Sequence, residues 1–279
     1  MKVRGAAVWI RVGIVLVFLG STSLASPGQA KDAAPWTLSW SDEFNAPDGT
    51  APDPAKWSFD LGGGGWGNNE RESYTARPEN AVQRGGNLVI TARQEAYTGA
   101  DGKAQQYTSA RMKTEGKFAQ AYGRFEARMK LPTGKGIWPA FWMLGADIGQ
   151  VDWPKAGEID VLEAIGPGTT VYSTLHGPGY SGAHALSTKF ELPGGEAIDA
   201  GFHVYAVEWA PEAIRFYFDD HLIVEQTPKD LPQGTAWVFD HPFFLLLDLA
   251  VGGRWPGDPD ATTALPAQML VDYVRVYRK

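Results

Sequence analysis

Residues 157–163 read Gly-Glu-Ile-Asp-Val-Leu-Glu, an apolar run that carries three carboxylates. Ile and Val favour strands, and on a helix Glu158 and Glu163 would lie well apart around the axis. On a regular strand, Glu158 and Asp160 share one face, whereas Glu163 falls on the other. Either one glutamate points into the core, or one extra residue in the strand brings all three acids to the same face.

The segment that follows favours the extra residue. The turn sequence Gly-Pro-Gly-Thr at 166–169 precedes a second strand-like run, Val-Tyr-Ser-Thr-Leu-His, at 171–176. In a regular hairpin around this turn, His176 lies opposite Ile159. With one residue inserted between the second and third acids, His176 lies opposite Glu158 instead.

This insertion also sorts the side chains of both strands into two consistent faces. The apolar face holds Ile159, Leu162, Val171 and Leu175. The polar face holds Glu158, Asp160, Glu163, Tyr172, Thr174 and His176. Because one insertion repairs both strands, the sequence predicts a β-bulge between Asp160 and Glu163.

Three interpretations of the crowded acids compete. An acidic solvent face is the commonest fate of charged residues, but like charges on neighbouring same-face positions repel each other. A calcium ion prefers oxygen ligands from a loop that can wrap it, and a strand presents its side chains too linearly. Hydrolysis of a glycosidic bond requires two carboxyl groups, one ionised and one protonated, and this interpretation needs the bulge.

The rest of the chain predicts an all-β fold in one domain. Strand-like runs alternate with turns rich in the 33 glycines and 19 prolines, and no long amphipathic helix is evident. The clearest runs cover residues 87–93, 123–131, 202–209, 214–220, 243–251 and 271–277. This pattern is typical of an antiparallel sandwich or barrel.

The N-terminus has the features of a secretory signal peptide. Residues 1–30 combine a basic start with a short apolar run, and cleavage is expected near Ala25 or Ala30. Residues 31–35 then form a short tail before a domain at 36–279. Loss of the three basic residues of the signal changes the formal charge from −7 to −10. We therefore expect a secreted protein, extracellular or periplasmic, that binds neither nucleic acid nor membrane after processing. The sequence contains no cysteine, which excludes disulfides.

Eleven tryptophans are many for this length. Four are expected in the core or at its rim: Trp36, Trp40, Trp57 and Trp209. Three lie beside glycines and polar residues and are expected on a binding surface: Trp66, Trp138 and Trp142. A flat indole can stack on the C–H face of a sugar ring, so these residues and the clustered acids together indicate a carbohydrate ligand.

The chain resembles glycoside hydrolase family 16, in its laminarinase-like (endo-β-1,3-glucanase) branch. The segment 157–163 resembles the bulged Glu-x-Asp-x-x-Glu signature of that branch, and similarity runs from 40–45 to 271–277 in family order. The resemblance implies a β-jelly-roll sandwich of two antiparallel sheets with a concave substrate cleft, and hydrolysis with retention. It implies Glu158 as nucleophile, Glu163 as acid/base and Asp160 as the helper between them.

The resemblance also implies binding residues, and no cofactor for catalysis. The implied cleft residues are Asn69, Arg111, Trp138, Trp142, Trp153 and His176. A structural calcium ion is implied at Glu43, the Gly85 carbonyl and Asp272. One position departs from the family, because Asp248 replaces the usual Asn of the sequence Leu-Asn-Leu-Ala-Val-Gly-Gly.

The chemical roles and the alternatives follow from this assignment. Negative charge on Glu158 and Asp160 is expected to keep Glu163 protonated. His176 either steadies the other two acids or is only a packed side chain. A non-catalytic glucan-binding protein on the same fold is the alternative from another class. Within enzymes, the alternatives are mixed-linkage β-1,3-1,4-glucan or a galactan such as agarose, because the loops 95–108 and 178–200 set the cleft walls. The polysaccharide substrate is the only partner expected, which predicts a monomer.

Overall fold

The computed structural model describes residues 35–166 and 168–279. Pro35–Lys279 form one compact unit. The expected signal peptide and the first four residues of the expected tail lie outside the described residues. Within the described residues, no helix has the length and apolarity needed to cross a membrane.

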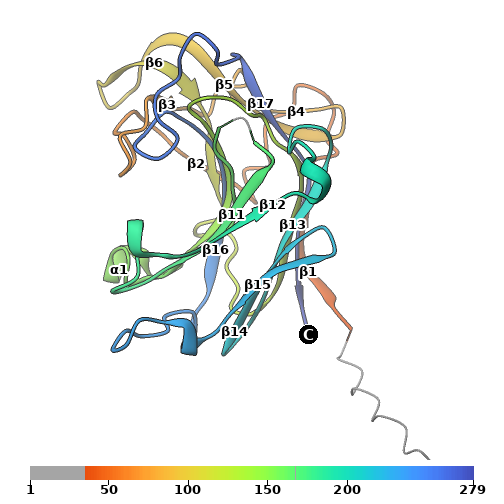
Figure 1. Ribbon diagram of the computed structural model, residues 1–279. Helices are drawn as coiled ribbons and strands as arrows, with labels where there is room; N and C mark the ends of the chain where they lie inside the picture. The colour runs from red at the N-terminus through yellow and green to blue at the C-terminus, as the bar shows by residue number, and fades with distance from the viewer. Residues whose placement is uncertain (1–34, 167) are drawn as a thin grey trace, which may run out of the picture. The chain divides into compact units, whose positions relative to one another are not determined.

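Two β-sheets form the layers of this unit (Figure 1). The ten-stranded sheet has the order β15-β14-β13-β8-β17-β5-β6-β3, with β1 on β17 and β4 on β5. Its strands are β1 (Thr37–Asp42), β3 (Glu72–Tyr74), β4 (Ala81–Arg84), β5 (Asn87–Thr98), β6 (Ala104–Ser109), β8 (Gly123–Lys130), β13 (His203–Ala210), β14 (Ala213–Phe218), β15 (His221–Gln226) and β17 (Ala267–Arg278).

The seven-stranded sheet has the order β12-β11-β10-β9-β16-β7-β2. Its strands are β2 (Ser58–Asp60), β7 (Arg111–Lys113), β9 (Ile137–Gly145), β10 (Glu158–Glu163), β11 (Thr170–His176), β12 (Leu186–Glu191) and β16 (Phe243–Val251). The helical elements of the described chain are α1 (Ile148–Val151) and the 3₁₀ turns η1 (Gly182–His184), η2 (Pro193–Gly195) and η3 (Pro228–Asp230). The described strand pairs are antiparallel except β3 with β6, which is parallel, and the prediction of two antiparallel sheets is confirmed.

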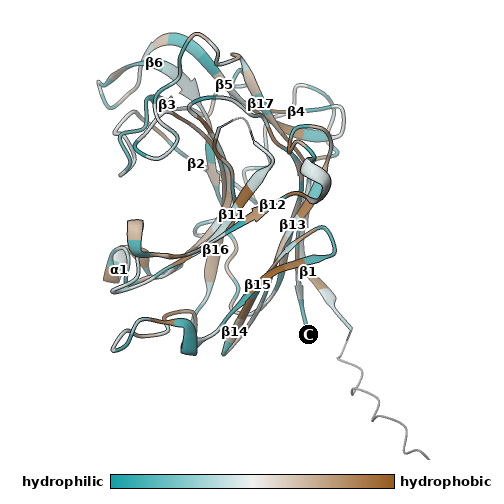
Figure 2. Ribbon diagram, viewed as in Figure 1, coloured by the Kyte–Doolittle hydropathy of each residue, from teal (hydrophilic) through white to brown (hydrophobic). Residues whose placement is uncertain are grey.

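The main core lies between the sheets, and strand periodicity explains why. On β16, Leu245, Leu247 and Leu249 belong to the main core, as do residues of β8 and β17 in the other sheet. Phe244 and Leu246 alternate with them and join a second apolar cluster on the opposite face. Figure 2 shows this distribution as hydrophobic colour along the strands of both layers and hydrophilic colour in many of the connecting loops. Strand β16 is therefore apolar on both sides, which accounts for its unbroken run of leucines.

The predicted strands are confirmed, with boundaries that shift by a few residues. The run at 243–251 coincides with β16, and the run at 271–277 is the second part of the longer β17. The segment 95–108, expected as a loop, is mostly strand, because β5 continues to Thr98 and β6 begins at Ala104. The alternation of exposed and half-buried residues in this hairpin shows that it extends beyond the core, where apolar periodicity fades.

Candidate active site

The predicted bulge is present in β10. Toward β11, Asp160 pairs with Thr174 and Glu163 pairs with Tyr172, so two residues of β10 lie opposite Ser173. Toward β9, the pairing passes from Asp160 directly to Leu162. Val161 is therefore the inserted residue, and Glu158 lies opposite His176 as the sequence predicted.

A buried hydroxyl satisfies the interrupted hydrogen-bonding ladder at this bulge. Ser173 Oγ donates to the carbonyl oxygen of Val161 over 3.0 Å, and the Ser173 side chain is on the core side with only 1% exposure. The predicted apolar face is also confirmed, since all four of its members lie in the main core: Ile159, Leu162, Val171 and Leu175. The acids are consequently on the outer face, the side of the seven-stranded sheet turned away from the core.

Indole N–H groups hold the two outer acids. Trp138 Nε1 donates to Glu163 Oε1 over 3.0 Å, and Trp153 Nε1 donates to Glu158 Oε2 over 3.0 Å. Trp138 lies in strand β9, whereas Trp153 lies in the loop after α1 and is 47% exposed. These contacts fix the orientation of both carboxyl groups while leaving one oxygen of each without an indole partner.

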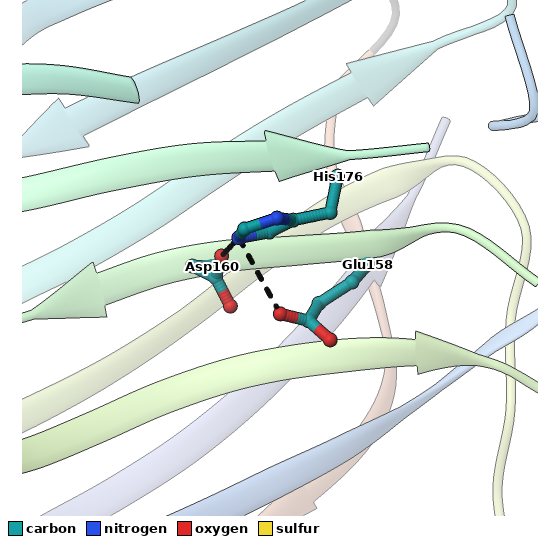
Figure 3. A group of neighbouring side chains, drawn as sticks. All are labelled: Glu158, Asp160 and His176. Carbon is teal, nitrogen blue, oxygen red and sulfur yellow. Dashed lines mark ion pairs between the residues drawn. The ribbon is translucent and has the colours of Figure 1, made fainter. Parts of the chain in front are cut away.

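His176 points toward Glu158 and Asp160 (Figure 3). Its Nε2 is 3.1 Å from Asp160 Oδ2 and 3.6 Å from Glu158 Oε1. The backbone N–H of Gly182 donates to His176 Nδ1 over 3.1 Å, so in the neutral ring the proton resides on Nε2. His176 therefore presents a donor to the acids, which supports the positioning role over the packed-residue alternative.

Burial raises the pKa of all three acids. The pKa of Glu158 rises from 4.5 to about 8, mainly through burial and then through the charge of Asp160. Burial likewise raises the pKa of Asp160 to about 8, although its hydrogen bond with Glu158 acts in the opposite direction. The pKa of Glu163 lies well above its usual range, with burial as the first cause and the charges of Asp160 and Glu158 as the next. The expected effect of neighbouring charges is therefore real but smaller than that of desolvation.

A coupled pair with these pKa values does not carry two charges near neutral pH. A side-chain hydrogen bond with Glu158 opposes the rise in the Asp160 pKa, and a proton held between the two leaves one negative charge on the pair once the first group ionises. Glu163, farther along the strand, keeps its own proton. The arrangement thus provides one ionised and one protonated carboxyl group on the same face.

A second group of side chains continues the outer face toward β7. The Arg111 guanidinium stacks between two indoles, 4.7 Å from the Trp142 ring and 5.0 Å from the Trp66 ring. Trp142 Nε1 donates to Asp248 Oδ1 over 2.6 Å. Trp142 pairs across the strands with Asp160, so this group adjoins the acids.

One aromatic residue of the site, Trp255, was not predicted from the sequence. Trp255 is 40% exposed, and its ring lies 5.5 Å from that of Trp138 and 4.9 Å from that of Tyr172. Tyr172 pairs with Glu163, so the three rings surround the acid from one side. The sequence around Trp255, Arg-Trp-Pro-Gly, has the same glycine-flanked character as the other cleft tryptophans and could have indicated it.

Asn69 is the predicted cleft residue that the structure connects least to the acids. Its side chain is exposed in the glycine-rich loop before β3, and its φ is +60°. Trp66 in the same loop has a φ of +44°. Left-handed backbone at two non-glycine residues in one loop is typical of functional segments, but the described hydrogen bonds include none from the Asn69 side chain.

The implied calcium ligands meet in space but do not fit an ion as they stand. Strand β17 pairs with both β1 and β5, which brings Asp272 near Glu43 and the β4–β5 turn that contains Gly85. Both carboxylates are engaged by arginines: Arg275 binds Glu43 through two contacts of 3.0 and 2.7 Å, and Arg128 binds Asp272 at 2.6 Å. Neutralised carboxylates are poor ligands for a hard cation.

Another group of potential ligands lies in the acid cluster itself. Among the described residues, Glu158, Asp160 and His176 are the one group of acidic and histidine side chains whose ligand atoms lie within 4.8 Å of one another. Their short contacts with one another already account for this proximity. The reaction of this site requires no metal ion, since the carboxyl groups supply both the nucleophile and the proton.

The fold and the site together define the class of protein. Buried carboxyl groups on one strand, which can supply one ionised and one protonated group and are surrounded by partly exposed indoles, are characteristic of a glycoside hydrolase. A β-sandwich that carries them on its outer face suits a long polysaccharide chain.

Comparison with known proteins identifies the family. The model of glycosyl hydrolases family 16 matches residues 68–275, and the chain belongs to this family. It is 45% identical to the "Beta-glucanase" of Rhodothermus marinus over 95% of this chain and 93% of that protein. Among solved structures, the laminarinase catalytic domain of Thermotoga maritima MSB8 is 49% identical with a TM-score of 0.82, covering 88% of this chain and 98% of that one. The endo-β-1,3-glucanase of Pyrococcus furiosus is 46% identical with a TM-score of 0.83, covering 87% and 94%. The jelly-roll prediction is thereby confirmed.

Proposed function

We propose that this protein is an endo-acting β-1,3-glucanase that hydrolyses laminarin-like glucan with retention of anomeric configuration. The observation that carries the proposal is the bulge at Val161, because it places Glu158, Asp160 and Glu163 on one face of β10. High identity to laminarinases over nearly the whole described chain supports the substrate.

In the first step, Glu158 acts as the nucleophile. Its carboxylate forms a bond to the anomeric carbon while the bond from that carbon to the leaving sugar oxygen breaks. Glu163 gives its proton to that oxygen, so the departing glucan leaves as an alcohol. The indole N–H of Trp138 donates to Glu163 Oε1 and so keeps the carboxyl group in place during this transfer.

In the second step, water releases the sugar. Glu163, now ionised, accepts a proton from a water molecule as the water oxygen bonds to the anomeric carbon. The bond between that carbon and Glu158 breaks, and the glucosyl unit departs with its original configuration. Asp160 shares the pair's proton with the regenerated Glu158 carboxylate, and His176 Nε2 lies 3.1 Å from Asp160 Oδ2.

Binding of the glucan is proposed to use the aromatic residues of the outer face. All three tryptophans Trp138, Trp142 and Trp153 are at least partly exposed. Trp138 and Trp153 donate indole N–H groups to Glu163 and Glu158, whereas Trp142 donates to Asp248 and pairs across the strands with Asp160. Their rings offer apolar platforms to sugar faces, while Arg111 and Asn69 provide donors for hydroxyl groups.

The non-catalytic alternative is weaker on physical grounds. A pure glucan binder gains nothing from three buried acids whose pKa values are raised by desolvation, because their burial costs stability. Mixed-linkage glucan and galactans such as agarose remain alternatives within enzymes, since the chemistry at the acids is the same for each.

A substrate panel tests the proposal. Purified protein is incubated with laminarin, mixed-linkage glucan, agarose and carrageenan, and product sizes are followed over time. We expect laminarin to yield a range of oligosaccharides early, as an endo-acting enzyme produces. Proton NMR of the first products should show the β-anomer before mutarotation. Early α-anomer would make Glu158 a base, and absence of cleavage on every substrate would refute the enzymatic proposal.

We further propose that the protein is secreted and acts as a monomer. Residues 1–30 carry the signal-like pattern, and Ala25 and Ala30 offer the cleavage sites. Mass spectrometry of protein exported by a host cell should give a chain beginning soon after one of these alanines. Size-exclusion chromatography should give the mass of one copy. A structural calcium ion at Glu43 and Asp272 would have to displace their arginine partners, and it is tested below.

A further inference from the structure

Asp248 is a buried charge on the outer face that the catalytic steps do not use. It belongs to β16 and is only 7% exposed. Its side chain lies on the same face of β16 as Phe244 and Leu246, which are on the outer face with Trp142. In cross-strand register it pairs with Arg111 of β7. A buried charge here costs desolvation energy unless hydrogen bonds and an opposite charge compensate for it.

Both oxygens of this carboxylate contact aromatic side chains. Oδ1 accepts from Trp142 Nε1 over 2.6 Å, and Oδ2 is 3.3 Å from the Tyr74 hydroxyl, whose single proton is shared with Glu70 Oε2 at 3.1 Å. The nearby positive charge is Arg111, whose Nε is 2.9 Å from Asp60 Oδ2. The guanidinium is in turn sandwiched between the rings of Trp66 and Trp142.

We propose, on the basis of the glucanase function above, that Asp248 is a positioning residue for substrate binding. Its negative charge fixes the Trp66–Arg111–Trp142 stack as a rigid sugar platform beside Asp160. It orients the Trp142 indole directly through the N–H group and the Trp66 indole through the guanidinium of Arg111. A pre-formed platform binds sugar without a further ordering cost.

The charge, and not only the hydrogen bonds, is the active property. An amide oxygen at this position could also accept from Trp142, and its NH₂ group could donate to Tyr74. An amide cannot supply the negative charge opposite Arg111. In the Asn variant, Arg111 would therefore keep only Asp60 as a nearby anionic partner. The substitution Asp248→Asn therefore removes the charge while preserving the shape and the hydrogen bond to Trp142.

The same charge reaches the catalytic acids. Asp160 pairs with Trp142, the residue that Asp248 holds, and the charge of Asp248 raises the pKa of Asp160. Burial and the charge of Asp248 also raise the pKa of Glu70 to about 7. The titratable and charged groups around Asp248 are Asp60, Glu70, Glu72, Tyr74, Arg111 and Asp160. Loss of this charge should lower the pKa of the Glu158–Asp160 pair.

The chain contains a matched control. Asp42 is also 7% exposed, and its Oδ2 accepts from Trp57 Nε1 over 2.8 Å. This carboxylate also accepts from an indole and has a cationic neighbour, Lys56 at 3.3 Å, but Asp42 ends β1 of the other sheet and Trp57 belongs to the main core. Asp42→Asn therefore reports the general cost of neutralising a buried aspartate bonded to an indole.

Steady-state kinetics on laminarin over a range of pH test the proposal. Asp248→Asn should raise KM about tenfold, the size of one charge-assisted contact, with kcat changed much less. It should also move the acidic limb of kcat/KM, which reports ionisation of the Glu158–Asp160 pair, to lower pH. Asp42→Asn should lower the melting temperature without either kinetic change. Unaltered KM and pH profile in Asp248→Asn, or the same kinetic changes in Asp42→Asn, would overturn the positioning role.

A second variant provides an independent test if Asp248→Asn folds poorly. Trp142→Phe removes the N–H that Asp248 holds but keeps an aromatic ring and leaves the charge in place. It should raise KM without moving the acidic limb, and an unchanged KM would overturn the proposal. The kinetics use whichever polysaccharide the wild-type chain cleaves. A failure on laminarin alone thus counts against the proposed substrate and leaves this comparison intact.

Discussion

The hydroxyl of Ser173 offers a direct test of the bulge on which the site depends. Ser173 is 1% exposed and donates to the carbonyl of Val161, the inserted residue. Ser173→Ala leaves that carbonyl buried without its partner, which costs about 1–3 kcal/mol. For a domain of this size, each kcal/mol corresponds to about 2–4 °C in melting temperature. We therefore expect the midpoint of thermal unfolding to fall by roughly 2–12 °C.

A second buried serine provides the comparison. Ser73 is fully buried, and its Oγ has no hydrogen-bond partner within the described part of the chain. Ser73→Ala removes a buried polar group that forms no bond, so stability should stay the same or rise. Differential scanning calorimetry of both variants, with kcat measured on laminarin, makes the comparison. If the bulge loosens, kcat should fall in Ser173→Ala, because Glu163 then loses its alignment with Glu158. Equal melting shifts in the two variants would show that this hydrogen bond does not hold the bulge.

Three further experiments address the acid, the platform and the implied ion. Glu163→Ala should lose most activity on glucan but far less on an aryl β-glucoside with an acidic phenol, which leaves without a proton, and equal losses would disprove the acid role. Trp138→Ala should weaken oligosaccharide binding by at most a few kcal/mol in calorimetry, whereas unchanged affinity would remove that indole from the binding surface. Because arginines occupy Glu43 and Asp272, the melting temperature should not respond to chelator or to added calcium. A rise with calcium would mean that backbone carbonyls such as that of Gly85 bind the ion.

The bulge could be predicted from the sequence because it is a local property of two adjacent strands. The positions of the acids, the turn at 166–169 and His176 restrict the pairing so strongly that only one insertion satisfies both faces. The main core was predictable for the same reason, since residues such as Leu175 and Leu247 alternate with polar or outer-face neighbours.

The surroundings of the acids could not be obtained in this way. Asp248 and Arg111 are far apart in the sequence, and only the packing of β16 on β7 brings them into register. Trp255 reaches the site from a loop whose path no local pattern encodes. The family resemblance indicated that Asp248 replaces an Asn, but it could not show that the carboxylate contacts Trp142 and Tyr74. Side-chain partners between non-local strands depend on topology, which periodicity does not specify.

The raised pKa values of Glu158, Asp160 and Glu163 also make a prediction about stability. In the folded chain the pKa of Glu158 is about 8, against 4.5 for an ordinary glutamate. Between these two values the folded state binds more protons than the unfolded state, so unfolding becomes easier as the pH rises. The stability associated with Glu158 is fully present below pH 4.5 and is lost as the pH rises through about 8. Asp160 and Glu163 shift in the same direction and add to the effect.

The variant Glu158→Gln should isolate the pH-dependent stability that the raised pKa of Glu158 contributes. Glutamine is neutral at every pH, and at pH 5 the wild-type carboxyl group is largely neutral as well, so the two proteins should then melt at similar temperatures. At pH 8.5 the wild-type group must carry its charge in a buried site, and the variant should be more stable by an amount on the order of a few kcal/mol. Thermal unfolding of both proteins from pH 5 to 9 measures the difference, with Glu79→Gln on an exposed loop as the control that should show no such trend. A difference between Glu158→Gln and wild type that does not grow with pH would mean that the Glu158 carboxyl group titrates normally, and that burial does not raise its pKa.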